Sequence, residues 1–210
     1  MVANAEFLYE AEELKLDKSE IYQEIKTAST QMTDLIDSLR ELAHQRSAIS
    51  PEPTDLEQVI GRAIEAVQAR PEFRNRTITL HADSDLEGMF DPRKLERVFF
   101  NLVLNACEAT PDGESRVAVE VQTRKEAFEI RVSDQGSGVA ENIRGRVFDP
   151  FVSSGKPNGT GLGLAIVSKI VSDHGGSVTI ERTSEAGTVM LVKLPRVSNA
   201  VASHSDSAVA

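Results

Sequence analysis

The stretch that decides the fold is residues 158–167, which read Asn-Gly-Thr-Gly-Leu-Gly-Leu-Ala-Ile-Val. Three glycines alternate with Thr160 and Leu162, and an apolar run of helical character follows. Glycine lets a ligand approach the main chain closely, and the N–H groups that open a helix favour an anion. The stretch therefore fits a phosphate-binding loop, and it fits equally a tight turn before an ordinary helix. It lacks the Lys-Ser/Thr ending of a P-loop and does not follow a strand as a dinucleotide-binding loop does.

Composition sets the broad class of protein. The chain has 210 residues, 40% of them hydrophobic, and a formal net charge of −10. This length suits one or two domains with a real core, and the acidic balance argues against broad nucleic-acid binding. The single cysteine, Cys107, excludes an internal disulfide and fits a reducing compartment. Because the sequence shows no signal peptide and no membrane-spanning run, we expect a cytoplasmic chain without membrane contact.

Residues 1–50 have the pattern of a helical hairpin. Residues 3–12 look like the end of a first helix, and a second helix carries an apolar seam with spacings of four and three. The seam consists of Ile21, Ile25, Ala28, Met32, Leu35, Leu39 and Leu42. A narrow seam normally packs on a partner helix, and residues 3–12 are too few to cover it. We therefore expect the hairpin to dimerise; the alternative is packing on residues 3–12 alone.

Residues 51–196 read as one α+β domain, an α/β sandwich. Two prolines in the Ser-Pro-Glu-Pro run at 50–53 break the preceding helix and mark the boundary. Periodicity predicts helices over 55–68, 91 to about 110, 141–147 and 161–174. It predicts strands over 77–81, 117–122, 127–132, 177–181 and 188–194, the second and third of which form a hairpin. Residues 197–210 are rich in serine and alanine and are expected to be disordered.

Two asparagines form the first of three further motifs. Asn101 and Asn105 are four residues apart and share one helix face with Glu108. Asparagine is mildly unfavourable inside a helix, so two in register invite a functional reason. Amide oxygens are hard ligands that suit Mg²⁺, which usually shares its coordination shell with phosphates. The alternative is a pair of surface amides, or a hydrogen bond from helix to loop.

The second motif is Asp-Gln-Gly-Ser-Gly at 134–138, directly after an expected strand. An ionised aspartate only accepts hydrogen bonds, so Asp134 would pair with the exocyclic amine of adenine and repel the O6 acceptor of guanine. Gly136 and Gly138 would let the backbone turn beneath a flat base. The alternative is an ordinary turn that contains an aspartate.

The third motif is Val-Phe-Asp-Pro-Phe at 147–151, in which two aromatic residues flank a turn. The polar loop 152–158 follows and could be a lid. We expect it to hinge on buried Phe148 and Phe151 and to bring Lys156 near a terminal phosphate. The alternative is that both phenylalanines belong to the core and that Lys156 is solvated.

The order and spacing of these motifs closely resemble those of bacterial sensor histidine kinases. The motifs match the N, G1, F and G2 boxes of that family, which shares its ATPase fold with gyrase, heat-shock-90 chaperones and mismatch-repair proteins. The resemblance covers residues 51–196, and residues 3–50 resemble the dimerisation and phosphotransfer hairpin that precedes that domain. It implies a mixed sheet covered on one face by helices, with the nucleotide between helices and lid. The Asn-Ala-Cys-Glu-Ala variant at 105–109 and the short lid are similar to the nitrogen-regulation type of kinase.

The resemblance implies ATP and Mg²⁺ as cofactors and a role for each motif residue. Asn105 would hold Mg²⁺ against the triphosphate, Asn101 would support it or touch phosphate, and Asp134 would read adenine. The other residues placed around the nucleotide are Glu108, Gly136, Gly138, Phe148, Phe151, Lys156, Gly159, Thr160, Gly161, Leu162, Gly163 and Thr188. The γ-phosphate would pass to a histidine on a dimerisation helix and then to an aspartate of a response regulator, in a homodimer whose parent protein is cytoplasmic or membrane-anchored.

The phosphoacceptor of that family is missing. It is a histidine followed by an acidic residue in the first helix of the hairpin, whereas none of His44, His81, His174 and His204 precedes Asp or Glu. We therefore expect the sequence to begin inside the first helix, just after the acceptor. Such a chain would not phosphorylate itself on the usual histidine, and its dimer would be weakened.

Three other functions stay open. A gyrase-like ATP hydrolase uses a glutamate as general base one helical turn before the metal asparagine, and Asn101, which occupies that place, cannot take a proton from water. An anti-sigma serine kinase of the same fold is disfavoured by the hairpin at 14–46. An interaction module that keeps the fold without nucleotide is disfavoured by the presence of Asp134, Asn105 and the loop glycines.

Overall fold

The computed structural model describes residues 49–110, 116–153 and 160–196, together with a subset of residues 21–42. The chain forms two compact units, residues 1–44 and 45–210. In the first unit the described residues are helical, as the heptad pattern predicts. None of the helices in these described ranges is long and apolar enough to cross a bilayer.

The predicted apolar seam of the first unit is unevenly covered. Ile21 is buried, whereas Met32 and Leu39 are 66% and 42% exposed. The remaining described members, Ile25, Leu35 and Leu42, are half-buried. Ala28 and residues 3–12 lie outside the described residues, so dimerisation through this seam stays a prediction.

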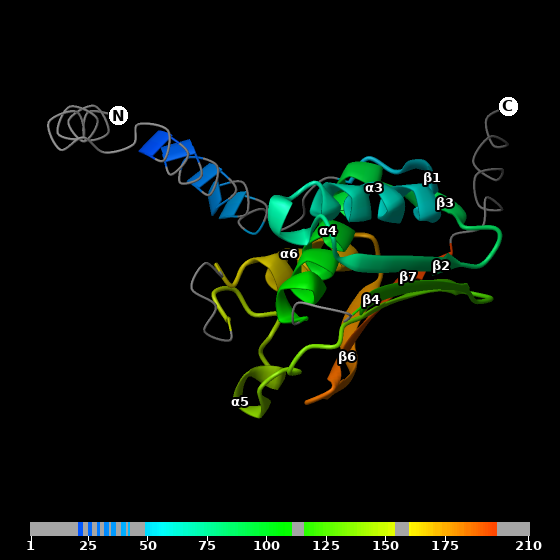
Figure 1. The fold of residues 1–210 in the computed structure, drawn as a ribbon. Helices are drawn as coiled ribbons and strands as arrows, with labels where there is room; N and C mark the ends of the chain where they lie inside the picture. The colour runs from blue at the N-terminus through cyan, green and yellow to red at the C-terminus, as the bar shows by residue number, and fades with distance from the viewer. Residues whose placement is uncertain are drawn as a thin grey trace, which may run out of the picture. The chain divides into compact units, whose positions relative to one another are not determined.

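The second unit is a mixed five-stranded sheet with helices on one face (Figure 1). The strands are β2 (Thr77–Ala82), β4 (Arg116–Thr123), β5 (Ala127–Ser133), β6 (Ser177–Ser184) and β7 (Gly187–Pro195). Their order is β2-β4-β5-β7-β6, in which β2 and β4 are parallel and every other neighbouring pair is antiparallel. The helices are α3 (Leu56–Gln68), α4 (Pro92–Ala109), the one-turn α5 (Glu141–Arg144) and α6 (Gly163–Asp173). These elements confirm the predicted α+β architecture.

The core lies between the sheet and the helices α3, α4 and α6. Alternate residues of β4 and β5 are buried, and their neighbours in sequence face away from the helices. The rings of Phe90 and Phe128 meet edge to face, with centroids 6.1 Å apart. On α3 the buried residues are Leu56, Val59, Ile60, Ala63, Ile64 and Val67. Each of the leucine, isoleucine and valine side chains contributes about 1.5–3 kcal/mol on burial, so α3 is fixed firmly on the core.

A small second sheet was not predicted from the sequence. Strand β1 (Glu52–Asp55) pairs antiparallel with β3 (Glu87–Phe90), and Pro53 stands opposite Met89. Proline is tolerated because a two-stranded sheet consists only of edge strands. A short 3-10 helix, η1 (Pro71–Phe73), was also not predicted. The prolines at 51 and 53 therefore lead directly into a strand. Residues 43–48, where the preceding helix is expected to end, lie outside the described residues, so that boundary stays a prediction.

Asp91 joins three parts of the second unit. Its Oδ1 accepts from the N–H of Lys94 at 3.2 Å and caps α4, and its Oδ2 accepts from the N–H of Ser50 at 3.1 Å. The Asp91 N–H donates to Nε2 of His174 at 3.1 Å, and Nδ1 of that ring lies 2.8 Å from the carbonyl of Ile170. His174 is therefore a buried structural histidine at the end of α6.

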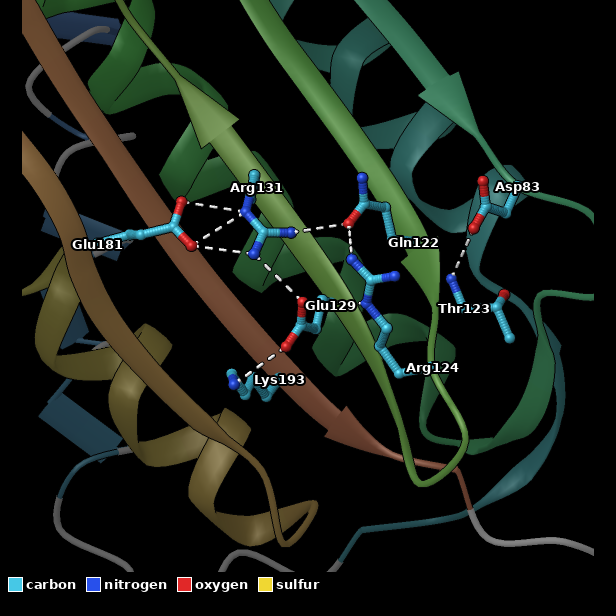
Figure 2. A network of polar contacts seen from close by, with 8 residues as sticks. All are labelled: Asp83, Gln122, Thr123, Arg124, Glu129, Arg131, Glu181 and Lys193. Carbon is cyan, nitrogen blue, oxygen red and sulfur yellow. Dashed lines mark hydrogen bonds and ion pairs between the residues drawn. The ribbon is translucent and has the colours of Figure 1, made fainter.

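The face of the sheet away from the helices carries a network of charged side chains (Figure 2). Arg131 donates from Nε to both carboxylate oxygens of Glu181, at 3.1 and 3.0 Å, and from Nη2 at 2.9 Å. Glu129 binds Lys193 at 3.0 Å and Arg131 at 3.2 Å. The hydrogen bond from Lys193 is the main cause that lowers the pKa of Glu129 to about 2. The bond from Arg131 likewise lowers the pKa of Glu181.

Candidate functional site

A cavity of about 280 Å³ opens between α4, the helix-side face of the sheet and the segment after β5. Nine of the residues predicted to form the site line it: Asn101, Asn105, Glu108, Asp134, Gly138, Thr160, Gly161, Gly163 and Thr188. Gly136, Phe148, Phe151 and Leu162 do not line it. Lys156 and Gly159 lie outside the described residues. Segments that are distant in sequence thus meet at one cavity.

Asp134 follows the end of β5 and is held in one orientation. Its N–H donates to the carbonyl of Thr188 at 2.9 Å. Its Oδ1 accepts from the N–H of Gly136 at 2.8 Å and from the N–H of Thr188 at 3.1 Å. Two main-chain donors on one oxygen fix the plane of the carboxylate, so the side chain of Asp134 is already oriented before a ligand binds.

The close approach of β7 to Asp134 depends on Gly187. This residue has φ +126°, and a Cβ on it would stand 2.0 Å from the carbonyl oxygen of Asp134. Real Cβ atoms do not approach a carbonyl oxygen so closely, so only glycine fits there without a shift of the backbone. Gly136 is buried instead against the backbone of Ala109, which explains why it does not line the cavity.

The two asparagines of α4 face the first turn of α6. Nδ2 of Asn101 donates to the carbonyl of Arg97 at 2.9 Å, which turns its Oδ1 toward Gly163. A Cβ on Gly163 would stand 3.3 Å from that Oδ1 and 4.0 Å from Nδ2 of Asn105. Among the described residues no side-chain hydrogen bond caps the start of α6, where Leu162 stands at the N-cap. Amide groups and main-chain N–H groups therefore line the same end of the cavity.

The prediction of buried phenylalanines in the third motif is wrong. Phe151 is 67% exposed and Phe148 is half-buried, whereas Val147 is buried. The reason is local: the N–H of Phe151 donates to the carbonyl of Gly161 at 2.9 Å, and Phe151 adopts φ +64°. This left-handed turn directs the ring outward, and it brings the chain so near Gly161 that a Cβ there would stand 2.5 Å from the carbonyl carbon of Phe151.

Apolar residues that the sequence reasoning did not identify form much of the cavity wall. Val139, Ile143 and Val147 line it from the segment after β5, and Val132 and Met190 line it from the sheet. The spacing of four between the first three is a helical signal that was available in the sequence. Apolar walls and a few fixed polar groups are typical of a small-molecule site.

Cys107 takes no part in the cavity. It is buried on α4, and burial raises the pKa of its thiol to about 11. A protonated thiol is a poor nucleophile and a poor metal ligand. Within the described residues no three His, Cys, Asp or Glu side chains gather into a metal-binding group.

The sequence matches a family model and several characterised proteins. The model for histidine kinase-, DNA gyrase B- and HSP90-like ATPases matches residues 90–198. The histidine-protein kinase/phosphatase MprB of Mycolicibacterium smegmatis is 37% identical over 177 residues, which are 81% of this chain and 34% of that protein. The C4-dicarboxylate transport sensor protein DctB of Rhizobium meliloti is 34% identical over 165 residues, or 77% of this chain and 26% of that protein. The chain thus spans about a third of these relatives or less.

Solved structures give the same result. The mycobacterial sensor histidine kinase MprB is 31% identical with a TM-score of 0.62, covering 70% of this chain and 97% of that one. The catalytic domain of the histidine kinase ThkA is 27% identical with a TM-score of 0.63, covering 70% and 96%. The chain therefore belongs to the histidine kinase-, DNA gyrase B- and HSP90-like ATPase family, and its domain is of the kind found in histidine kinases.

Proposed function

We propose that residues 51–196 bind ATP with Mg²⁺ and present its γ-phosphate to a histidine on a dimerisation helix of a sensor histidine kinase. The phosphoryl group would then pass to an aspartate of a response regulator. The observation that carries this proposal is the convergence of Asp134, Asn105 and the start of α6 on one cavity.

Asp134 is the proposed reader of the base. Since its Oδ1 is occupied by two main-chain N–H groups, the carboxylate has a fixed plane. An ionised carboxylate accepts hydrogen bonds and donates none. It therefore favours the exocyclic amine of adenine over the carbonyl that guanine carries at the same position. The buried residue Thr188 lines the same cavity.

The triphosphate is proposed to lie between α4 and the start of α6. The missing side chain of Gly163 leaves space next to the amides of Asn101 and Asn105, and uncapped helical N–H groups favour phosphate oxygens. Amide oxygens suit Mg²⁺, so we assign Asn105 to the metal. Bound Mg²⁺ would neutralise phosphate charge; Lys156 and Gly159 stay predicted contacts of the phosphates.

The residues of the cavity can position a phosphoryl group, and α4 carries no base for water at the position one turn before Asn105. Phosphoryl transfer needs mainly alignment and charge neutralisation. Asn101 stands where a hydrolase of this fold would need a general base, and its amide cannot take a proton. The acceptor is therefore proposed to be a histidine rather than water. The exposed Met32 and Leu39 of the N-terminal helix support a homodimer as the setting for transfer.

Calorimetric titration of the 210-residue chain with Mg-ATP and Mg-GTP tests this proposal. We expect ATP to bind much more tightly than GTP, and Asp134→Asn to weaken ATP binding about 100-fold or more, since the amide presents a donor to the amine. Glu120→Gln, which removes one charge from an exposed position on β4, is the matched control and should bind like the wild type. Equal affinity for GTP, or an Asp134→Asn variant with unchanged affinity, would overturn the assignment.

The metal assignment needs a separate titration. With EDTA in place of Mg²⁺ we expect weaker ATP binding in the wild type. In Asn105→Ala the affinities with and without Mg²⁺ should become similar. A full Mg²⁺ effect in Asn105→Ala would move the metal to other ligands while leaving the nucleotide site in place.

A further inference from the structure

Thr183 lies outside every motif described above, yet it connects two walls of the cavity. Its Oγ1 accepts from the N–H of Val139 at 2.8 Å and lies 3.2 Å from Oγ1 of Thr188. Val139 and Thr188 both line the cavity. The Thr183 hydroxyl on β6 therefore links the turn that follows Asp134 to strand β7, whose residue Thr188 donates its N–H to Asp134.

A β-bulge in β6 places this hydroxyl. Ile180 pairs with Met190, and the next pair is Arg182 with Val189, so Glu181 is the extra residue of the ladder. Thr183 consequently stands opposite Thr188. A shift of one residue exchanges the two faces of a strand. In a regular ladder Arg182 would stand opposite Thr188, with a guanidinium in place of the hydroxyl.

The bulge is held from the opposite face of the sheet. Glu181 receives three hydrogen bonds from Arg131 of β5, and Figure 2 shows this pair lying across the strands. Because β5 is separated from β6 by β7 in the sheet, the pair spans the ladder that contains the bulge. The bulged residue Glu181 thus binds Arg131 on the face of the sheet opposite the Thr183 hydroxyl.

We propose that Thr183 is a positioning residue for recognition of the base, an inference that rests on the proposed function of Asp134 and Thr188. The N–H of Val139 occupies one lone pair of the Thr183 hydroxyl, which makes that hydroxyl a better donor to Thr188. Donation from Thr183 leaves the Thr188 proton for a ring-nitrogen acceptor of a purine. The same hydroxyl holds the turn of Gly138 and Val139 against β6.

The test compares Thr183→Val, which keeps the shape and removes the hydroxyl, with Thr183→Ser, which keeps the hydroxyl. Thr179→Val, at an exposed position of the same strand, is the matched control. We expect Thr183→Val to weaken Mg-ATP binding about 5- to 10-fold and to reduce the ratio of ATP to GTP affinity. Thr183→Ser and Thr179→Val should stay within about twofold of the wild type.

Thermal unfolding of each variant separates positioning from stability. The proposal requires that Thr183→Val binds weakly at temperatures where it is fully folded; Thr183→Ala serves if the valine variant does not fold. Wild-type affinity and selectivity in Thr183→Val would overturn the proposal, as would a serine variant that fails to restore them. Absence of ATP binding by the wild type would instead reject the proposed function itself, and this inference with it.

Discussion

The two faces of the five-stranded sheet are held by different kinds of interaction. On the helix side, the cavity takes its shape from main-chain contacts: Oδ1 of Asp134 accepts two backbone N–H groups, and Gly187 brings β7 against the Asp134 carbonyl. On the other side, Arg131 and Glu129 bind each other and their neighbours through side chains, most of them charged (Figure 2).

This difference predicts how each face of the sheet should respond to substitution, pH and salt. Two main-chain segments in contact leave no space for an added carbon atom. Substitutions that add atoms on the cavity face should therefore lower stability and ligand affinity. A charged network near solvent is screened and adaptable, so the other face should be sensitive to pH and salt and tolerant of substitution. Three experiments test that contrast.

Gly187→Ala should have the largest effect. The new Cβ would stand 2.0 Å from the Asp134 carbonyl oxygen at a φ of +126°, so either β7 or the turn of Asp134 must move. We expect a loss of about 3 kcal/mol in the free energy of unfolding and weaker ATP binding. Urea unfolding and calorimetry measure the two effects.

Gly145→Ala is the matched control for that substitution. Gly145 has φ −76°, and nothing lies within 4 Å of the position of its Cβ. We expect stability and binding close to those of the wild type. If the two alanine variants were equally stable, the close approach at Gly187 would not be what shapes the cavity.

Glu129→Gln should have an intermediate effect that depends on pH. The pKa of Glu129 is about 2 in the folded protein against an ordinary value of 4.5. A lowered folded pKa stabilises the protein above the unfolded pKa, and this contribution is lost as pH falls toward 2. We expect the substitution to cost about 1 kcal/mol at pH 7, allowing for screening by solvent, with ATP affinity unchanged.

Urea unfolding between pH 7 and pH 2.5 measures that contribution. The difference between wild type and Glu129→Gln should shrink as the pH falls through this range. Glu120→Gln, exposed on the same face, is the matched control for the loss of one carboxylate. A constant difference across the range would mean that Glu129 acts through packing rather than through its charge.

The smallest effect is the salt dependence of a single pair. A double-mutant cycle on Arg131 and Glu181 should give a coupling free energy of about 0.5–1 kcal/mol at low salt. The coupling should fall at 1 M salt, where the screening length shortens from about 10 Å to about 3 Å. The pair Arg62 and Glu96, joined by one 3.0 Å contact between exposed side chains of α3 and α4, should couple more weakly. A salt-independent coupling for Arg131 and Glu181 would contradict the contrast between the faces.

Periodicity predicted the elements that are long enough to repeat their buried face. Helix α3 and strand β5 are examples, because apolar residues recur at the buried position of every helical turn or every second strand residue. Strands β1 and β3 have four residues each, too few to display a pattern. Their pairing depends on partners far along the chain, as does the strand order of the sheet.

The sequence also predicted part of the site, where local spacing and residue type were sufficient. Asn101, Asn105 and Asp134 were identified from spacing and residue chemistry, and the fold brings them to one cavity; their roles stay predictions. The burial of Phe151 was wrong, because residue type alone does not reveal a left-handed turn. Thr183 was not identified, since a bulge of one residue leaves no trace in the alternation of β6.

The hydrogen bond between the Thr188 N–H and Asp134 spans 54 residues. This hydrogen bond closes a long loop, and closing a long loop costs conformational entropy. During folding such a contact forms only after other favourable contacts have offset that cost. The hairpins β4–β5 and β6–β7 join neighbouring segments and can form early, whereas the cavity wall awaits the pairing of β5 with β7. A ligand of this cavity can therefore stabilise only the completed domain, and tighter binding adds to the free energy of unfolding of that domain.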